Sequence, residues 1–376
     1  MNALFLRWTV AMLTLMCAAE ALADGKMFAE KVPTTIPYQR AIILHTGETQ
    51  TLVLQSQYQI PGASETKALG WVVPVPAVPK IASTSSESAD SAFMWMDMAT
   101  KPSVTRISTI GILILLYLPI ASSLIFFVCG IIKWRGTREK WFLRSGVSIL
   151  VLLIVFLATA LSVTAWKAGA SGVETLESRQ AGIYDVKVIR AKAAADLLAW
   201  LNENAFQFGP DDEAAIQAYL DKGWVFTVAK IRPSTPPPAP SRFSEGLADP
   251  LILRFPATNP IYPLALTAAG GHDTEVLIYL ASDVPRIGDG RLPLRYTGSA
   301  KSHTKRAINT LYAAMVESTE FSETSDVWED GYLSGKSPFT RIAKFKGTLT
   351  PDQMRKDLEF LPDPNQTDYR EHIFRW

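Results

Sequence analysis

Two long apolar runs dominate the hydrophobic pattern of this chain. Residues 107–132 and 146–166 contain no Asp, Glu, Lys, Arg or His. At about 1.5 Å of rise per residue, either run as a helix would cover the roughly 30 Å core of a bilayer. The pattern therefore predicts a transmembrane hairpin made of two helices.

A basic loop, residues 133–145, joins the two runs. It contains one acid, Glu139, and a set of cationic side chains, which are Lys133, Arg135, Arg138, Lys140 and Arg144. Cationic loops stay on the cytoplasmic side, so the loop is expected inside and both flanking parts outside. The aromatic residues at the ends of the runs are expected to anchor them at the membrane interface; they are Trp134, Trp141 and Trp166.

The N-terminus has the pattern of a secretory signal. Arg7 precedes an apolar run at residues 8–19, and the small residues Ala21 and Ala23 follow. Small side chains at these two positions predict a signal peptide over residues 1–23, with cleavage before Asp24. Both large segments are therefore expected on the exported side of the membrane.

Shorter patterns predict strands and helices in the exported parts. A β-hairpin is expected over residues 41–46 and 49–56. A strand ended by proline is expected over 70–76, where Pro74 and Pro76 indicate an edge strand or a strand exit. Residues 83–90 are polar and are expected to form a loop, followed by a short helix over 90–98. A β-α-α-β unit is expected from a strand at 184–189, helices at 193–201 and 210–222, and a strand at 224–231.

A proline-rich connector, residues 233–241, separates this unit from the last part of the chain. Strands are predicted after it over 251–255, 261–267, 275–281 and 341–345. Helices are predicted over 306–318 and after Thr350, which precedes a proline.

These elements predict an α+β fold, a mixed-sheet domain with packed helices interrupted by the two-helix transmembrane hairpin. Residues 24–106 offer too few elements to bury a core, so we expect them to pair with residues 167–376 in one domain. The predicted order is signal peptide 1–23, exported part 24–106, spans 107–132 and 146–166 around the loop 133–145, and exported part 167–376.

Composition excludes several classes of protein. The net charge is +1, so nothing indicates a nucleic-acid partner. The two cysteines are Cys17, in the signal peptide, and Cys129, in the first apolar run. The exported part therefore has no disulfide, thiolate metal site or cysteine nucleophile.

The sequence has few candidates for catalysis. It has no Gly-x-Ser-x-Gly, His-Glu-x-x-His, phosphate loop or Gly-x-Gly-x-x-Gly, and no cofactor is predicted. His272 and Asp273 are weak catalytic or metal-binding candidates, because they follow Gly270-Gly271 and a turn explains them more simply.

Aromatic and proline residues of the exported parts can build either a core or a binding groove for an extended ligand, and we favour the core. This set comprises Trp71, Pro74, Pro76, Trp200, Trp224, Tyr262 and Pro263.

Several segments resemble one bacterial family, domain of unknown function 2330. They include Asp24-Gly-Lys-Met-Phe, Gly70-Trp-Val-Val-Pro-Val-Pro, Gly182-Ile-Tyr-Asp-Val-Lys-Val-Ile and Pro260-Ile-Tyr-Pro-Leu-Ala-Leu-Thr. The resemblance covers nearly the whole exported chain and implies export with a membrane hairpin or anchor. With this resemblance, the expected location is the bacterial inner (cytoplasmic) membrane, with both large segments on the periplasmic side. It implies no activity, so it transfers no catalytic residue.

The expected function is a membrane-anchored exported protein, more simply non-enzymatic, that binds or scaffolds another component of the cell envelope. Its expected partners are the lipid bilayer and another envelope protein. Two alternatives remain open. One is a cell-envelope hydrolase or metal-dependent enzyme using His272 and Asp273, and the other is an accessory subunit of a membrane transport complex.

Overall fold

The computed structural model describes residues 26–29, 35–59, 69–106, 172–204, 206, 208, 211–231, 247–316 and 337–375. These residues fall into two compact units. The large unit lies within Met1–Ser103 and Ser171–His372, and the small unit lies within Val104–Ala170 and Ile373–Trp376.

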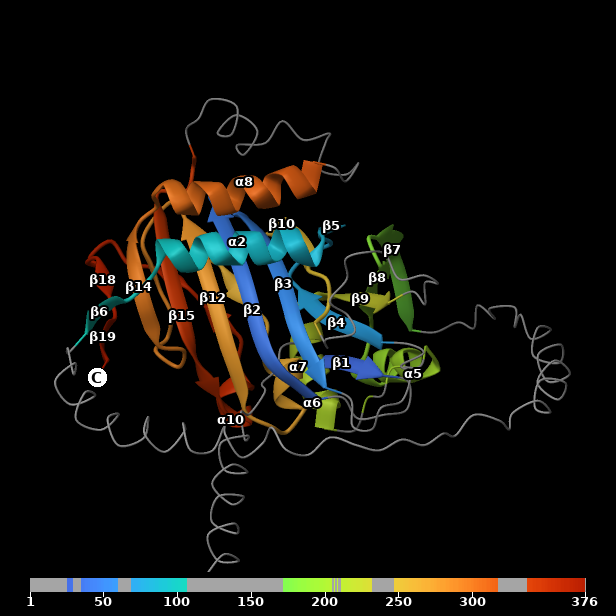
Figure 1. The fold of residues 1–376 in the computed structure, drawn as a ribbon. Helices are drawn as coiled ribbons and strands as arrows, with labels where there is room; N and C mark the ends of the chain where they lie inside the picture. The colour runs from blue at the N-terminus through green and yellow to red at the C-terminus, as the bar shows by residue number, and fades with distance from the viewer. Residues whose placement is uncertain are drawn as a thin grey trace, which may run out of the picture. The chain divides into compact units, whose positions relative to one another are not determined.

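An eight-stranded sheet forms the centre of the large unit (Figure 1). Its strands, in spatial order, are β18 (Tyr369–Arg370), β14 (Leu294–Ser299), β15 (Arg341–Leu349), β12 (Thr274–Ser282), β2 (Thr35–Thr46), β3 (Thr49–Gln59), β10 (Leu251–Pro256) and β5 (Lys80–Ser83). Neighbours are antiparallel except β12 and β2, which are parallel, so the sheet is mixed.

A five-stranded antiparallel sheet accompanies it. Its order is β1 (Lys26–Ala29), β4 (Leu69–Val75), β9 (Val225–Ile231), β8 (Tyr184–Ala191) and β7 (Val173–Ala181). Both sheets combine strands that precede residue 107 with strands that follow residue 171. The segments at the two ends of the chain therefore complete each other's sheets.

Alternation along the strands divides the large unit into four layers. In β4, Trp71 and Val73 belong to a core that includes residues of both sheets, whereas Val72 belongs to the core of the outer face. In β2, Ile43 faces the shared core and Ile42 faces the opposite side. Each sheet is therefore buried on two faces, because successive side chains of a strand point to opposite faces.

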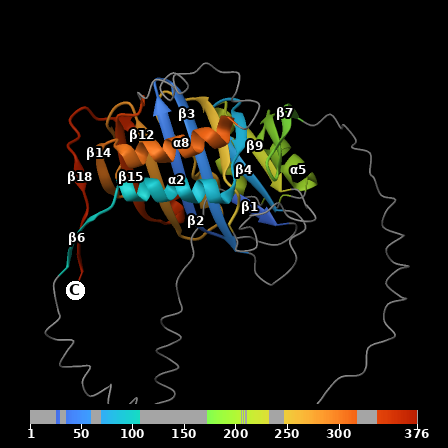
Figure 2. The same cartoon turned by 45° about the horizontal axis from the view of Figure 1, so that its top comes forward.

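Helices cover the outer face of each sheet. On the eight-stranded sheet, α2 (Ser86–Ala99) and α8 (Ser302–Val316) lie side by side (Figures 1 and 2). On the five-stranded sheet, the outer core includes residues of α5 (Ala194–Glu203), α6 (Asp211–Asp221) and α7 (Ala265–Ala268).

Short elements complete the described chain. Three strand pairs are β11 (Ile261–Tyr262) with β16 (Leu358–Glu359), β13 (Arg286–Ile287) with β17 (Leu361–Pro362), and β6 (Ser103–Arg106) with β19 (His372–Arg375). The helix α10 (Pro351–Met354) begins with a capping box, in which Thr350 and Gln353 satisfy each other's backbone N–H groups.

Many predicted elements are confirmed. The hairpin is β2 and β3, joined at Gly47, whose φ of 56° suits glycine. The β-α-α-β unit is β8, α5, α6 and β9, and α6 is followed by Gly223 at a φ of 73°. The strands predicted at 251–255, 275–281 and 341–345 are β10, β12 and β15, and the helices predicted at 306–318 and after Thr350 are α8 and α10.

Two local predictions are wrong. Residues 261–267 are not one strand, because only Ile261–Tyr262 is extended and α7 follows. Residues 83–90 are not one loop, because α2 begins at Ser86 with the Ser85 hydroxyl accepting from the N–H of Ser88.

Of the two alternatives for the strand over 70–76, the strand exit is confirmed, because β4 ends at Val75 just before Pro76, and the edge strand is corrected. In the five-stranded sheet β4 lies between β1 and β9. The ladder with β1 ends opposite Val72, so among the described strands only β9 lies beside Pro74. A proline is tolerated there because one side of the strand requires no ladder hydrogen bond.

The predicted fold class is corrected as well. The described residues are α+β with a mixed sheet, but none of their helices is long and apolar enough to cross a membrane, so the transmembrane hairpin is not supported. The spans at 107–132 and 146–166 and the loop at 133–145 lie outside the described residues.

Candidate functional site

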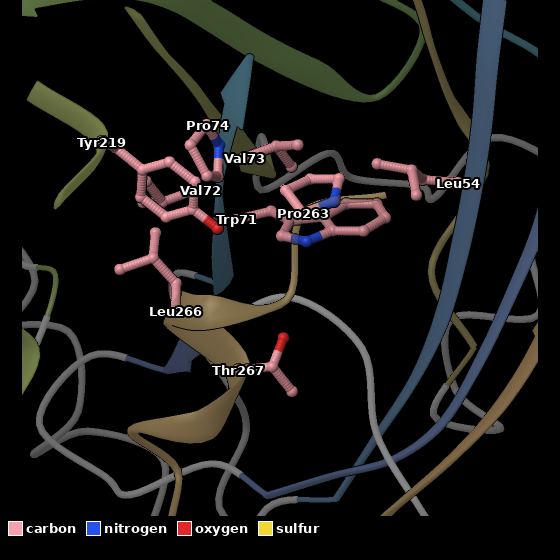
Figure 3. Close-up of a pocket in the computed structure, with 9 residues that line it drawn as sticks. All are labelled: Leu54, Trp71, Val72, Val73, Pro74, Tyr219, Pro263, Leu266 and Thr267. Carbon is pink, nitrogen blue, oxygen red and sulfur yellow. The ribbon is translucent and has the colours of Figure 1, made fainter. Parts of the chain in front are cut away.

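A small pocket lies where β3, β4, α6 and α7 meet, and we call it the Trp71 pocket (Figure 3). It has an empty volume of about 270 Å³ with open solvent included, and the space inside it has room for about one water molecule. Its lining residues are Leu54, Trp71, Val72, Val73, Pro74, Tyr219, Pro263, Leu266 and Thr267. All nine are buried, and most are apolar.

One polar atom in this lining has no partner. The Trp71 side chain is only 1% exposed, and its indole Nε1 makes no hydrogen bond in the described part of the chain. In the view of Figure 3, the indole nitrogen points toward the hydroxyl of Thr267 across the pocket. A buried N–H without an acceptor costs free energy, so this donor is suited to an acceptor brought by a bound molecule.

Gly70, which precedes Trp71, lets the ring of Phe206 lie close to the backbone of β4. A Cβ on Gly70 would lie 2.1 Å from a ring carbon of Phe206, which is itself buried. The aromatic ring therefore packs directly on the backbone of β4 beside Trp71. Only glycine allows that approach.

A chain of buried amide and hydroxyl groups holds Thr267 in place. The Gln39 amide nitrogen donates to the Thr267 hydroxyl over 3.4 Å, and the Tyr262 hydroxyl donates to the Gln39 carbonyl over 3.0 Å. Gln39 and Tyr262 are fully buried. Gln39 of β2, itself held by Tyr262, therefore positions the Thr267 hydroxyl in the pocket.

The opposite wall is fixed by the carboxylate of Asp357. It accepts a hydrogen bond from the Tyr219 hydroxyl, one from the Lys222 ammonium over 3.1 Å, and one from the backbone N–H of Leu264 over 2.9 Å. The N–H of Ala265 adds a longer contact of 3.4 Å to Asp357 and donates to the Tyr219 oxygen over 3.1 Å. Burial and the neighbouring Asp357 charge raise the pKa of Tyr219 well above its usual value, so the phenol stays protonated.

This arrangement suits binding of an uncharged group. Among the described residues of the lining, Tyr219 is the only ionisable one, and its hydroxyl is already hydrogen-bonded to Asp357 and Ala265. Thr267 accepts from Gln39. The walls are therefore preformed, and the Trp71 N–H is the donor left for a ligand.

The two catalytic candidates lie in the turn between α7 and β12. Gly271, at a φ of 73°, turns the chain there, and His272 Nδ1 hydrogen-bonds the carbonyl of Gly270 over 2.8 Å. Asp273 is exposed, and within the described chain no hydrogen bond joins it to His272. The turn connects a helix to a strand rather than two strands, and the catalytic role of both residues stays a prediction.

The remaining histidines are dispersed. His45 is buried at the end of β2, where its Nε2 lies 2.8 Å from the Ala257 carbonyl. His303 stacks on Trp95, and His372 Nδ1 lies 2.6 Å from the Ser103 hydroxyl. Among the described residues, no group of three or more His, Cys, Asp or Glu side chains could hold a metal ion.

The predicted membrane and signal residues lie outside the described ranges. This holds for the signal cleavage residues, the aromatic anchors and the cationic loop residues, which are Ala21, Ala23, Asp24, Trp134, Trp141, Trp166, Lys133, Arg135, Arg138, Lys140 and Arg144. Their roles stay predictions.

The aromatic and proline set identified from the sequence divides in the structure. Trp71, Pro74 and Pro263 line the pocket, whereas Tyr262 is core. Sequence reasoning missed Tyr219, Leu266 and Thr267 as lining residues. Leu266 and Thr267 were missed because residues 261–267 were predicted as a strand. Tyr219 lies on the buried face of α6, and the only sequence signal for this was its spacing of three residues from the apolar Ile216.

The fold and the pocket define an α+β protein with a preformed, uncharged pocket. The chain belongs to a bacterial family described as "Uncharacterized protein conserved in bacteria (DUF2330)", which matches residues 137–329. The crystal structure of baculovirus P35 is similar at 9% sequence identity over 87% of this chain and 91% of that chain, with a TM-score of 0.26. That likeness is too weak to support any argument. No curated protein matches the chain.

Proposed function

We propose that this protein is an exported, non-enzymatic binding component of the bacterial cell envelope. In this proposal the Trp71 pocket receives an uncharged, largely apolar group that carries one hydrogen-bond acceptor. The observation that supports it most directly is the buried Trp71 N–H, which has no hydrogen-bond partner among the described residues, in a pocket where Thr267 and Tyr219 are hydrogen-bonded.

The chemistry of the lining restricts the ligand. A charged group would lose its hydration in a pocket that offers no counter-charge, which is costly. A carbonyl or ether oxygen would accept from the Trp71 N–H while its alkyl substituents contact Val73, Pro74 and Leu266. Because the pocket has room for about one water molecule, the acceptor oxygen would enter while the alkyl substituents stay at its mouth, and a whole cofactor would not fit.

Binding can be tested with N,N-dimethylacetamide, a carbonyl acceptor that carries methyl groups. We expect ligand-observed NMR on the full-length protein to show binding that Trp71→Phe weakens about 2- to 10-fold, because the ring is kept and one hydrogen bond of about 0.5–1.5 kcal/mol is lost. Trp95→Phe, on α2, is the matched control. Equal binding by the wild type and Trp71→Phe would remove the support for this site.

The envelope location rests on the N-terminal sequence and has its own test. Mass spectrometry of the mature protein from its bacterial host should find an N-terminus at Asp24. A mature chain that retains Arg7 and residues 8–19 in the cytoplasmic fraction would count against export.

A further inference from the structure

His45 is a fully buried histidine near the end of β2, and it takes no part in the Trp71 pocket. Its ring nitrogen Nε2 lies 2.8 Å from the carbonyl oxygen of Ala257, and its Nδ1 lies 3.3 Å from Nη2 of Arg286. A carbonyl oxygen only accepts and a guanidinium only donates, so Nε2 carries a proton and Nδ1 carries none. The two contacts therefore fix His45 as a neutral ring that accepts from an arginine.

Arg286 is a cation buried among mostly neutral groups. Its side chain is 5% exposed, and its Nη1 donates to the side-chain oxygen of Asn259 over 3.1 Å and to the carbonyl of Phe360 over 3.3 Å. Its Nε has no hydrogen-bond partner in the described part of the chain. A buried charge is costly without a close counter-charge, so the acceptor on His45 is one of the few groups that hold Arg286 in place.

The carboxylate of Asp283, between β12 and β13, lies just beyond hydrogen-bond distance from this arginine. Its Oδ1 is 4.0 Å from Nη2 of Arg286, and among the described residues this oxygen has no hydrogen-bond partner. Its Oδ2 accepts from the backbone N–H of Gly47 over 3.1 Å, at the turn between β2 and β3. An acceptor and a donor without partners therefore lie in one group of side chains.

Protonation of His45 would change this group in a defined way. A proton on Nδ1 turns the acceptor for Arg286 into a second donor and places two positive charges against each other in a buried site. Burial lowers the pKa of His45 below its ordinary 6.5, and the Arg286 charge lowers it further, whereas the contact with Ala257 and the Asp283 charge act in the opposite direction. The ring is therefore neutral at pH 7 and takes a proton only in acid.

The surrounding elements offer Arg286 no other free carboxylate among the described residues. Their remaining charged groups are either paired elsewhere or exposed; they are Glu359, which binds Asn259, Arg341, which pairs with Asp368, and Glu48 at the β2–β3 turn. Asp283 is therefore the carboxylate that can receive Arg286.

We propose that His45, Arg286 and Asp283 form an acid-triggered switch. At neutral pH, Arg286 binds the neutral ring of His45 and the carbonyl of Phe360. When the ring takes a proton, the guanidinium leaves it and pairs with Oδ1 of Asp283. Neither state uses the lining of the Trp71 pocket, so this proposal does not depend on the proposed binding function.

The movement acts on the short strand pair formed by β13 and β17. Arg286 belongs to β13, and Phe360 directly precedes β17. Ile287 and Leu361 lie opposite each other in this pair and are 43% and 49% exposed, so the pair buries little apolar surface of its own. Segments with few buried contacts open at low free energy, and we expect this pair to loosen once Arg286 turns away.

Hydrogen exchange of the full-length protein, followed by mass spectrometry, tests the switch. After correction for the intrinsic pH dependence of exchange, we expect the amides of residues 283–290 and 358–363 to lose protection about tenfold between pH 7.5 and pH 5. His45→Gln should remove this loss, because its amide can still donate to Ala257 and accept from Arg286 but does not titrate. His303→Gln, on α8, is the matched control and should lose protection like the wild type.

Asp283→Asn provides a second readout, because it keeps an oxygen for the Gly47 N–H and removes the charge. An NMR titration should place the pKa of His45 below 6.5 in the wild type and lower still in this variant, since the Asp283 charge favours the protonated ring. Protection that stays unchanged at pH 5, or a loss that persists in His45→Gln, would overturn the proposal. So would an equal loss in residues 184–191 of β8, which indicates global unfolding, or a His45 titration that Asp283→Asn leaves unchanged.

Discussion

Replacement of Asp357 by alanine should be among the most destabilising single changes in the large unit. The Asp357 side chain is only 4% exposed and accepts from Tyr219, Lys222, Leu264 and Ala265. These donors come from α6, from the residue that follows it, and from the start of α7. One carboxylate therefore connects α6, α7 and the segment before β16.

The magnitude follows from what each donor loses. The Tyr219 hydroxyl and the backbone N–H of Leu264 are buried and would have no acceptor, at about 1–3 kcal/mol for each fully orphaned group. The N–H of Ala265 would keep the Tyr219 oxygen as its acceptor. The Lys222 side chain is 49% exposed and can return to water, so its lost ion pair adds less than about 1 kcal/mol. Because such losses are not additive, we expect about 3–5 kcal/mol for Asp357→Ala.

The comparison with Lys222→Met makes the test specific. That change removes the cation but leaves the carboxylate with its buried donors, and we expect it to cost less than about 1 kcal/mol. Urea unfolding of the full-length protein, followed by tryptophan fluorescence, measures both. The reasoning is refuted if Asp357→Ala unfolds within about 1 kcal/mol of the wild type, or if Lys222→Met is equally destabilising.

Two further changes test local packing and pH dependence. Gly70→Ala should cost about 1–3 kcal/mol in urea unfolding because its Cβ would meet the buried Phe206 ring, whereas Gly288→Ala, with its nearest neighbour at 3.5 Å, should cost little. Burial lowers the pKa of His45 below its ordinary 6.5, and the Arg286 charge lowers it further. The unfolded chain therefore binds the proton more readily, so the stability from neutral His45 is present above pH 6.5 and lost as the pH falls below it. His45→Gln should reduce the loss in urea midpoint between pH 7.5 and pH 5; an unchanged loss would show that other groups cause it.

The candidate site could be predicted from the sequence only in part. Trp71, Pro74 and Pro263 were identifiable as large or rigid apolar residues outside the two long apolar runs. The sequence did not indicate that Tyr219 and Thr267 would join them, since α6 and α7 are brought to β4 by the tertiary fold and not by proximity in the sequence. Nor did it indicate Asp357, whose partners lie 92 to 138 residues away along the chain.

The sequence by itself determined the elements whose signal is local. Alternating apolar and polar residues around a glycine turn specify β2 and β3. Apolar residues at helical spacing, flanked by two strands, specify the unit from β8 to β9. Each of these patterns repeats several times within one element, so it can be recognised locally. Only the tertiary structure decided that β4 pairs with both β1 and β9, that β2 runs parallel to β12, and that residues 265–268 form a helix. Pairing between distant segments leaves no repeating pattern in either one, and a helix of one turn is too short to show its period.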